Sequence, residues 1–139
     1  PQPWRHAARG FNVSADGLRS EWTGRVWLNP PYSNWSAWVE RLANHGSGTA
    51  LLFARTETAD FVRIVWGRAH SILFLWGRLR FHAPDGTRAK GNAGGPSCLV
   101  AYSARDSIQL AASGIPGSFV ALQLGAACVA AGPSPPIGN

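Results

Sequence analysis

The chain has 139 residues, of which 45% are hydrophobic, and this is enough for one domain with an apolar core. Thirteen basic residues against seven acidic ones give a net charge of +6, which favours a polyanionic partner such as nucleic acid. Twelve of the thirteen are arginine, a residue that forks onto phosphates and base edges but that a GC-rich genome also favours.

Cysteine content and charge distribution exclude several further classes. Two cysteines are too few for a disulfide scaffold, and Cys98 lies in an apolar run, so we expect a reduced, cytoplasmic protein. The longest stretch without charges, 107–139, is too rich in glycine, proline and serine to span a membrane. No cluster of histidine, cysteine and aspartate has the spacing of metal ligands, and we predict no metal.

The first expected elements are short. Phe11–Val13 has the composition of a strand, and Asp16–Leu18 that of a tight turn. Val26–Leu28 is an apolar run of strand length, and Asn29–Tyr32, with the sequence Asn-Pro-Pro-Tyr, follows it directly. The two prolines fix φ at successive positions and remove two backbone donors. We therefore predict a rigid elbow at the carboxyl end of a strand, which is where open α/β sheets bind ligands.

Downstream of the elbow the pattern alternates between helix and strand. Either Ser33 or Asn34 is a suitable helix cap, and apolar residues at helical spacing predict a helix that ends within 44–48. Further elements are expected at 49–53 (strand), 60–69 (helix, with Thr58 as its cap) and 71–76 (strand). This alternation predicts an α/β fold with a mostly parallel sheet.

The last part of the sequence predicts an antiparallel addition to that sheet. Arg78–Phe81 and Pro84–Gly86 indicate a hairpin, and the polar, glycine-rich stretch 87–97 indicates a mobile loop. Further elements are expected at 97–102 (the last strand, antiparallel to its hairpin partner), 107–113 (a short helix) and 119–120 (a short apolar piece). From Ala121 the chain is rich in alanine, glycine and proline, so we divide it into a domain, 1–120, and a poorly ordered tail, 121–139.

The elbow has the chemistry of a site for a base amine. The amide oxygen of Asn29 and the carbonyl oxygen of Pro30 can both accept from a planar amino group, and Tyr32 offers a flat face to the ring. When both amine hydrogens are accepted, the nitrogen lone pair points out of the base plane and can attack. Adenine is the base that fits best.

Asn29-Pro30-Pro31-Tyr32 resembles the target-amine motif of DNA amino-methyltransferases. With Asp16–Leu18, Trp22–Leu28 and Gly77–Phe81, it resembles the phage-type DNA N-6-adenine methyltransferases, from about Arg9 to Val120. The resemblance implies a Rossmann-like fold, S-adenosylmethionine as cofactor, double-stranded DNA as partner and methyl transfer to the N6 amine of a flipped adenine. It also implies a prophage-encoded protein of the bacterial cytoplasm.

Roles for individual residues follow from this resemblance. The catalytic elbow would be formed by Asn29, Pro30, Pro31 and Tyr32. Two other residues would bind the adenine of the cofactor: Asp16 would accept a hydrogen bond from its amine, and Leu18 would pack on its ring. The family's Thr-Pro segment and the turn that holds the methionine end of the cofactor are absent. We therefore expect the N-terminal portion of the family's domain to be missing, so that this stretch need not be active alone.

DNA contact is expected between Gly77 and Gly95. The candidates are Arg88 and Lys90 for phosphates, Arg78 or Arg80 nearer the bases, and Phe81. A solvated basic hairpin is the alternative for this segment, and the hairpin could lie at the elbow's edge of the sheet or at the far one. Two alternatives remain for the whole chain. One is a non-catalytic nucleic-acid-binding relic of the fold, and the other is a protein-interaction module that uses the Asn-Pro-Pro-Tyr turn.

Overall fold

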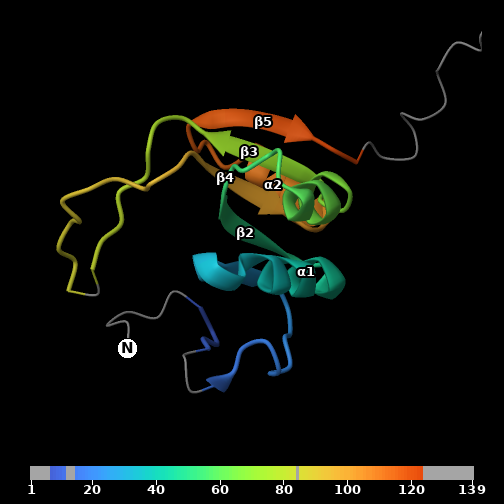
Figure 1. Ribbon diagram of the computed structural model, residues 1–139. Coiled ribbons are helices and arrows are strands. Elements are labelled where there is room, and N and C mark those ends of the chain that lie inside the picture. Colours follow the sequence, from blue (N-terminus) through green and yellow to red (C-terminus); the bar gives the residue numbers. More distant parts are fainter. Residues whose placement is uncertain (1–6, 12–14, 84, 124–139) are drawn as a thin grey trace, which may run out of the picture.

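The structure, a computed structural model, describes residues 7–11, 15–83 and 85–123 and has an α/β architecture (Figure 1). One five-stranded mixed sheet is packed by helices on both faces. The elements in chain order are β1 (Val26–Leu28), η2 (a 3-10 turn, Tyr32–Asn34), α1 (Trp35–His45), β2 (Gly48–Phe53), η3 (a π-helix, Phe61–Trp66), β3 (Ser71–Leu75), β4 (Ser97–Ala101), α2 (Ala104–Ala111) and β5 (Gly117–Ala121).

The strands are arranged in the order β1-β2-β4-β3-β5. Within the described residues β1 and β2 form the one parallel pair, and the pairs β2–β4, β4–β3 and β3–β5 are antiparallel. The prediction of a mostly parallel sheet is therefore wrong. β1, β2 and β3 do run in the same direction, but β4 inserts between β2 and β3 and separates two strands that could otherwise have paired in parallel. β5 then adds a further antiparallel strand beside β3.

The two faces of the sheet are covered by different helices (Figure 1). α1 and η3 pack on one face, where Leu42, Phe61 and Ile72 are completely buried. α2 packs on the other face, over β3 and β4, with Leu110 beside Leu99. Because β1, β2 and β3 point the same way, their carboxyl ends, and the loops that leave them, meet at one edge of the sheet.

α1 lies within its predicted bounds, whereas the second helix is shorter than predicted. Asn34 is the N-cap residue of α1 but makes no side-chain capping bond, and Gly46, with φ 74°, ends the helix where a left-handed residue is needed. The predicted 60–69 helix is a shorter π-helix. Its expected cap was wrong, since the Thr58 hydroxyl donates to the Arg55 carbonyl (3.0 Å).

The hairpin predicted after β3 is present. An antiparallel bridge joins His82 to Arg88, and the Ala83 N–H donates to the Thr87 carbonyl (2.8 Å). Pro84 of its turn lies outside the described residues.

The C-terminal elements extend beyond their predicted bounds. β4 is antiparallel, as expected, but it is not the last strand, because the short apolar piece at Phe119 belongs to β5. β5 runs to Ala121, past the expected domain boundary, and α2 starts earlier than Ser107. Most of the predicted tail (124–139) and residues 12–14 of the expected first strand lie outside the described residues.

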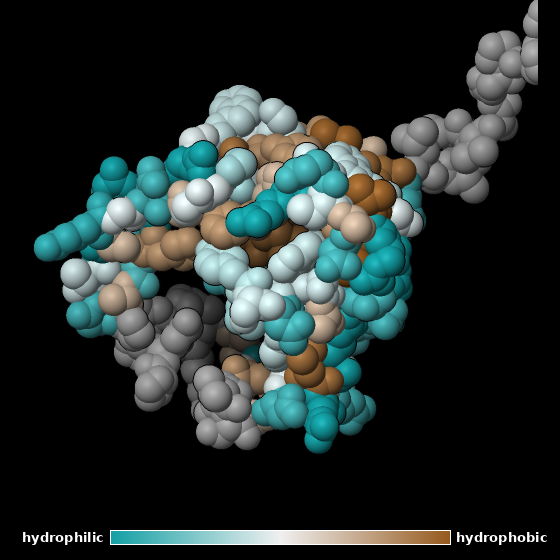
Figure 2. All heavy atoms as spheres, viewed as in Figure 1, coloured by the Kyte–Doolittle hydropathy of each residue, from teal (hydrophilic) through white to brown (hydrophobic). Residues whose placement is uncertain are grey.

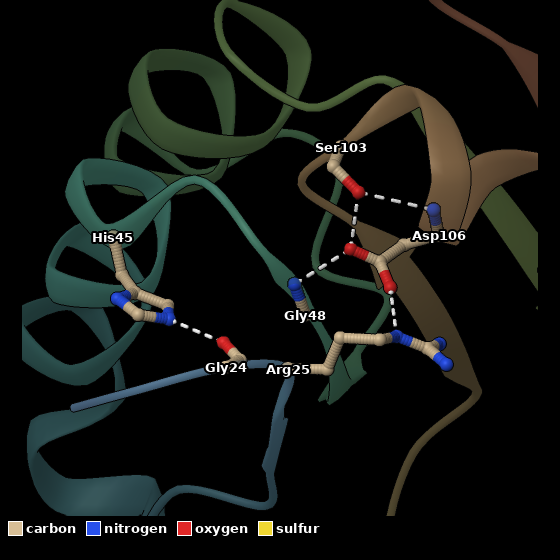
Figure 3. A network of polar contacts seen from close by, with 6 residues as sticks. All are labelled: Gly24, Arg25, His45, Gly48, Ser103 and Asp106. Carbon is tan, nitrogen blue, oxygen red and sulfur yellow. Dashed lines mark hydrogen bonds and ion pairs between the residues drawn. The ribbon is translucent and has the colours of Figure 1, made fainter.

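One buried carboxylate ties the amino edge of the sheet together (Figure 3). Asp106, on α2, accepts from Arg25 Nε (2.7 Å), from the Gly48 N–H (2.7 Å) and from the Ser103 hydroxyl. The Ser103 hydroxyl in turn accepts the Asp106 N–H (3.0 Å) and caps the helix. These contacts join α2, the start of β2 and the segment that enters β1. Burial raises the pKa of Asp106, but the bonds from Ser103, Arg25 and Gly48 outweigh it, and the pKa lies below its usual range.

Asp106→Asn should lower the free energy of unfolding at pH 7 by about 1–3 kcal/mol, because an amide leaves one of the buried donors without an acceptor. The loss should be constant above about pH 5, since the unfolded carboxyl titrates near 4. It should shrink as the pH falls through the lowered folded pKa, where the wild type loses its own carboxylate. Urea unfolding followed by tryptophan fluorescence at several pH values measures this difference.

Asp60→Asn is the matched control. Asp60 is half-exposed and pairs with Arg63 one turn away (3.1 Å), so its replacement should change the stability little. If the two variants were equally stable at pH 7, the Asp106 hydrogen bonds would not stabilise the fold.

Candidate functional site

The elbow turns the chain from β1 into η2 and α1 within a few residues. Pro30 is buried and fixes the elbow to the body, while Pro31 is extended (φ −64°, ψ 138°), as its ring favours. Asn29 is exposed, and Tyr32 is 58% exposed. The elbow therefore presents a side-chain amide and an aromatic ring to solvent at the carboxyl end of β1.

Tyr32 is stacked on Phe53, the last residue of β2. The two ring centroids lie 4.4 Å apart with 8° between the planes. A cavity of about 270 Å³ opens beside the pair, and its lining residues are Pro30, Tyr32, Trp35, Leu51, Leu52, Phe53 and Arg55. This volume is just below the usual range for ligand pockets, and an apolar lining with three aromatic rings and one cation suits a planar heterocycle.

The basic loop between β3 and β4 lies at the same edge of the sheet (Figure 1). The register pairs Phe53 with Ser97, so the loop returns to the sheet beside the end of β2. The Ala54 N–H donates to the Pro96 carbonyl (2.9 Å), and a Cβ built on Gly95 would lie 3.4 Å from the Phe53 ring. The hairpin is thus on the elbow's side, which answers the question that the sequence left open.

Basic side chains gather along this edge, and Figure 2 shows the projecting loop with many hydrophilic residues. These side chains are Arg55, Arg78, Arg80, Arg88 and Lys90. Arg78 donates from Nη1 to the Ala93 carbonyl (3.5 Å), and it is exposed, as are Arg80, Arg88 and Lys90. Phe81 is 39% exposed among them. A protein surface that combines cations with aromatic rings has the composition of a single-strand or flipped-base site.

Asp85 is the acid at the tip of the hairpin. It accepts the Thr87 N–H (2.8 Å), and this bond lowers the pKa of its carboxyl group. Asp85 is therefore ionised at neutral pH and stabilises the hairpin turn.

The two residues expected to hold the cofactor adenine are not brought to the cavity. Asp16 is exposed, with φ 35°, and its carboxylate pairs with Arg19 at 3.5 Å. The turn that contains Asp16 and Leu18 closes on itself, since the Gly17 carbonyl accepts the Trp22 indole N–H (2.8 Å), and Gly17 packs closely against Trp38 of α1. S-adenosylmethionine carries a cationic sulfonium and an ammonium group, and no acid is among the described residues that line the cavity. The lining of this cavity therefore offers no counter-charge to the two cationic groups of that cofactor.

Three residues of this edge escaped sequence reasoning. Phe53 has the pattern of a core residue at the end of a buried strand, so nothing in the sequence marked it as a partner of Tyr32. Arg55 follows that strand in a loop at its carboxyl end, and this position was the signal that could have found it. Gly95 was recognised only as part of a glycine-rich run.

Neither a metal-binding group nor a helix able to cross a membrane is found among residues 7–11, 15–83 and 85–123. Cys98 is a free, buried thiol, and burial raises its pKa to about 12, so it is not a nucleophile at neutral pH. The chain matches no protein-family model, no curated protein and no solved structure.

If Arg88 and Lys90 contact phosphates, replacing both with alanine should weaken binding to duplex DNA evenly across sequences. Each lost phosphate contact lowers the slope of log affinity against log salt by roughly 0.9, so the double variant should have a slope smaller by about two. Fluorescence anisotropy with a labelled duplex over a range of salt measures both quantities.

Arg105→Ala serves as the control, because Arg105 is exposed on α2 near the opposite edge of the sheet. Its slope should equal that of the wild type. An unchanged slope in the Arg88 and Lys90 double variant would make the hairpin an ordinary solvated surface.

Proposed function

We propose that this chain is the target-base part of a DNA adenine-N6 methyltransferase with a Rossmann-like fold, and that it captures a flipped adenine at the elbow. The observation that carries the proposal is the placement of Asn29 and Tyr32 at the carboxyl end of β1, beside a base-sized cavity and the basic loop. An acceptor, a stacking ring and phosphate-binding cations on one edge are what recognition of an extruded base requires.

The sheet supports this proposal. In a doubly wound sheet the strands of each half follow one another in chain order from the centre of the sheet towards its edge. Ligands bind at the centre, where the two halves meet. The strands β1, β2 and β3 occur in this order across the sheet and run in the same direction. The antiparallel strand β4 lies between β2 and β3. The elbow leaves the carboxyl end of β1, the first strand of that order and an edge strand of the described sheet.

The groups at the elbow would act by position. The Asn29 amide oxygen and the Pro30 carbonyl accept the two amine hydrogens and leave the nitrogen lone pair free, while Tyr32 holds the ring plane. Arg55 and the basic loop hold the neighbouring phosphates. S-adenosylmethionine would supply the methyl group when bound, but because no acid lines the cavity beside the elbow, the role derived for this chain is base capture.

A second candidate is a non-catalytic protein that binds nucleic acid with the same elbow. The cavity's lack of acidic lining favours it. Incubation of the protein with tritiated S-adenosylmethionine and DNA separates the two, since label in DNA supports the enzyme. Binding to adenine-containing DNA without label supports the binding protein, and the absence of both contradicts the proposal.

Asn29→Ala should lower the preference for adenine over purine, the same ring without the amine, by about 0.5–1.5 kcal/mol, the net value of one hydrogen bond. Labelled single strands with adenine or purine at one central position measure this by anisotropy. Asn29→Asp keeps an acceptor oxygen and should retain part of the preference. Equal losses for both strands in Asn29→Ala would show that Asn29 does not contact the amine.

Tyr32→Phe should bind the adenine strand nearly as well as the wild type, because the ring that stacks on Phe53 remains. Tyr32→Ala should lose about 1–3 kcal/mol, the usual value of base–aromatic stacking. The same anisotropy assay compares them. If Tyr32→Phe bound the adenine strand as weakly as Tyr32→Ala, the hydroxyl group would be what contacts the base, and stacking would be excluded.

A further inference from the structure

The elbow's aromatic ring has a partner to which the proposed function gives no role. Tyr32 lies in a three-residue turn, and 58% of it is exposed. A ring in such a place would ordinarily sample several rotamers. Here it lies parallel to the Phe53 ring at 4.4 Å, so one of its faces is already covered by protein.

Phe53 is itself held from several directions. Its backbone is in register with Ser97 of β4, and the next residue, Ala54, donates its N–H to the Pro96 carbonyl (2.9 Å). The Gly95 main chain approaches the Phe53 ring closely enough that an added Cβ would be in van der Waals contact with it. The half-buried Phe53 ring is therefore fixed to the sheet and to the start of β4, whereas the Tyr32 ring is fixed through Phe53.

We infer that Phe53 is a positioning residue, which holds the Tyr32 ring as a preformed platform so that its outer face receives the adenine. This inference rests on the proposed function. A base inserted between the two rings would have to break their stack, while the outer face of Tyr32 is open to solvent. Because the ring is already held in place, no conformational entropy of its side chain is lost when the base binds. This is the general source of affinity in preorganised sites.

The first readout is independent of any ligand. The chain has two tyrosines, Tyr32 and the buried Tyr102, so protein labelled with 3-fluorotyrosine should give two fluorine NMR signals, assigned with Tyr32→Phe. Phe53→Leu should move the Tyr32 signal, because the ring current of Phe53 is lost, and leave the Tyr102 signal in place. An unmoved Tyr102 signal also reports an intact core. Phe119→Leu, on β5, is the matched control and should move neither.

The second readout is binding to a labelled single strand of twelve deoxyadenosines, with twelve thymidines for comparison. Phe53→Leu should weaken binding to the adenine strand roughly two- to tenfold, the share expected from a lost preorganised side chain. In the Tyr32→Ala background the same change should have no further effect, because Phe53 acts only through Tyr32. Phe53→Tyr adds a fluorine signal of its own but keeps a ring, so it should retain both the Tyr32 signal and the affinity, which guards against a variant that fails to fold.

The two ideas fail in different ways. If the wild type does not prefer the adenine strand, the proposed function is contradicted, whatever the fluorine spectrum shows. If the wild type binds adenine, but Phe53→Leu leaves the Tyr32 signal or the affinity unchanged, the positioning role alone is overturned. An equal loss on Phe53→Leu with and without Tyr32 would overturn it as well, since Phe53 would then act independently of Tyr32.

Discussion

The position of β4 between β2 and β3 is the constraint on which the site depends. β2 and β3 point the same way, so the antiparallel strand between them must enter at their carboxyl ends. The loop from β3 to β4 therefore stays at that edge and brings its basic residues beside the elbow. Had β4 instead followed β3 as another parallel strand, a crossover would have carried this segment to the opposite edge.

The edge combines a rigid aromatic part with an adaptable charged part. Its aromatic part is rigid, since Pro30 is buried and Tyr32 is stacked on a ring that belongs to the sheet. Its charged part is an exposed hairpin held by a few backbone bonds. Rigid stacking suits a planar base, and adaptable cations suit a phosphate backbone whose path is not fixed in advance. The buried Asp106 network lies at the other edge, so stability and proposed function are separated along the strands.

Sequence reasoning found what local pattern determines and missed what distant contacts determine. The helical stripe of α1, the strands at 49–53 and 71–76 and the rigid elbow follow from periodicity and proline geometry, and the structure contains all of them. Strand order depends on which strands pair in the folded protein, so the position of β4 between β2 and β3 could not be predicted from the sequence. The contact between Tyr32 and Phe53 joins the turn after β1 to the end of β2, and no local sequence pattern indicates it. Ser103 and Asp106 do form a capping pattern, and that signal for the earlier start of α2 was overlooked.

The most direct test of base capture at the elbow is photocrosslinking with a DNA strand that carries 8-bromoadenine at one position. Cleavage after arginine releases a peptide, 26–41, that contains the elbow and the first part of α1, and fragmentation in the mass spectrometer locates the modified residue. The account predicts that the modified residue is Tyr32 and that excess adenine strand suppresses the crosslink. Crosslinks confined to other peptides, with peptide 26–41 unmodified, would contradict it.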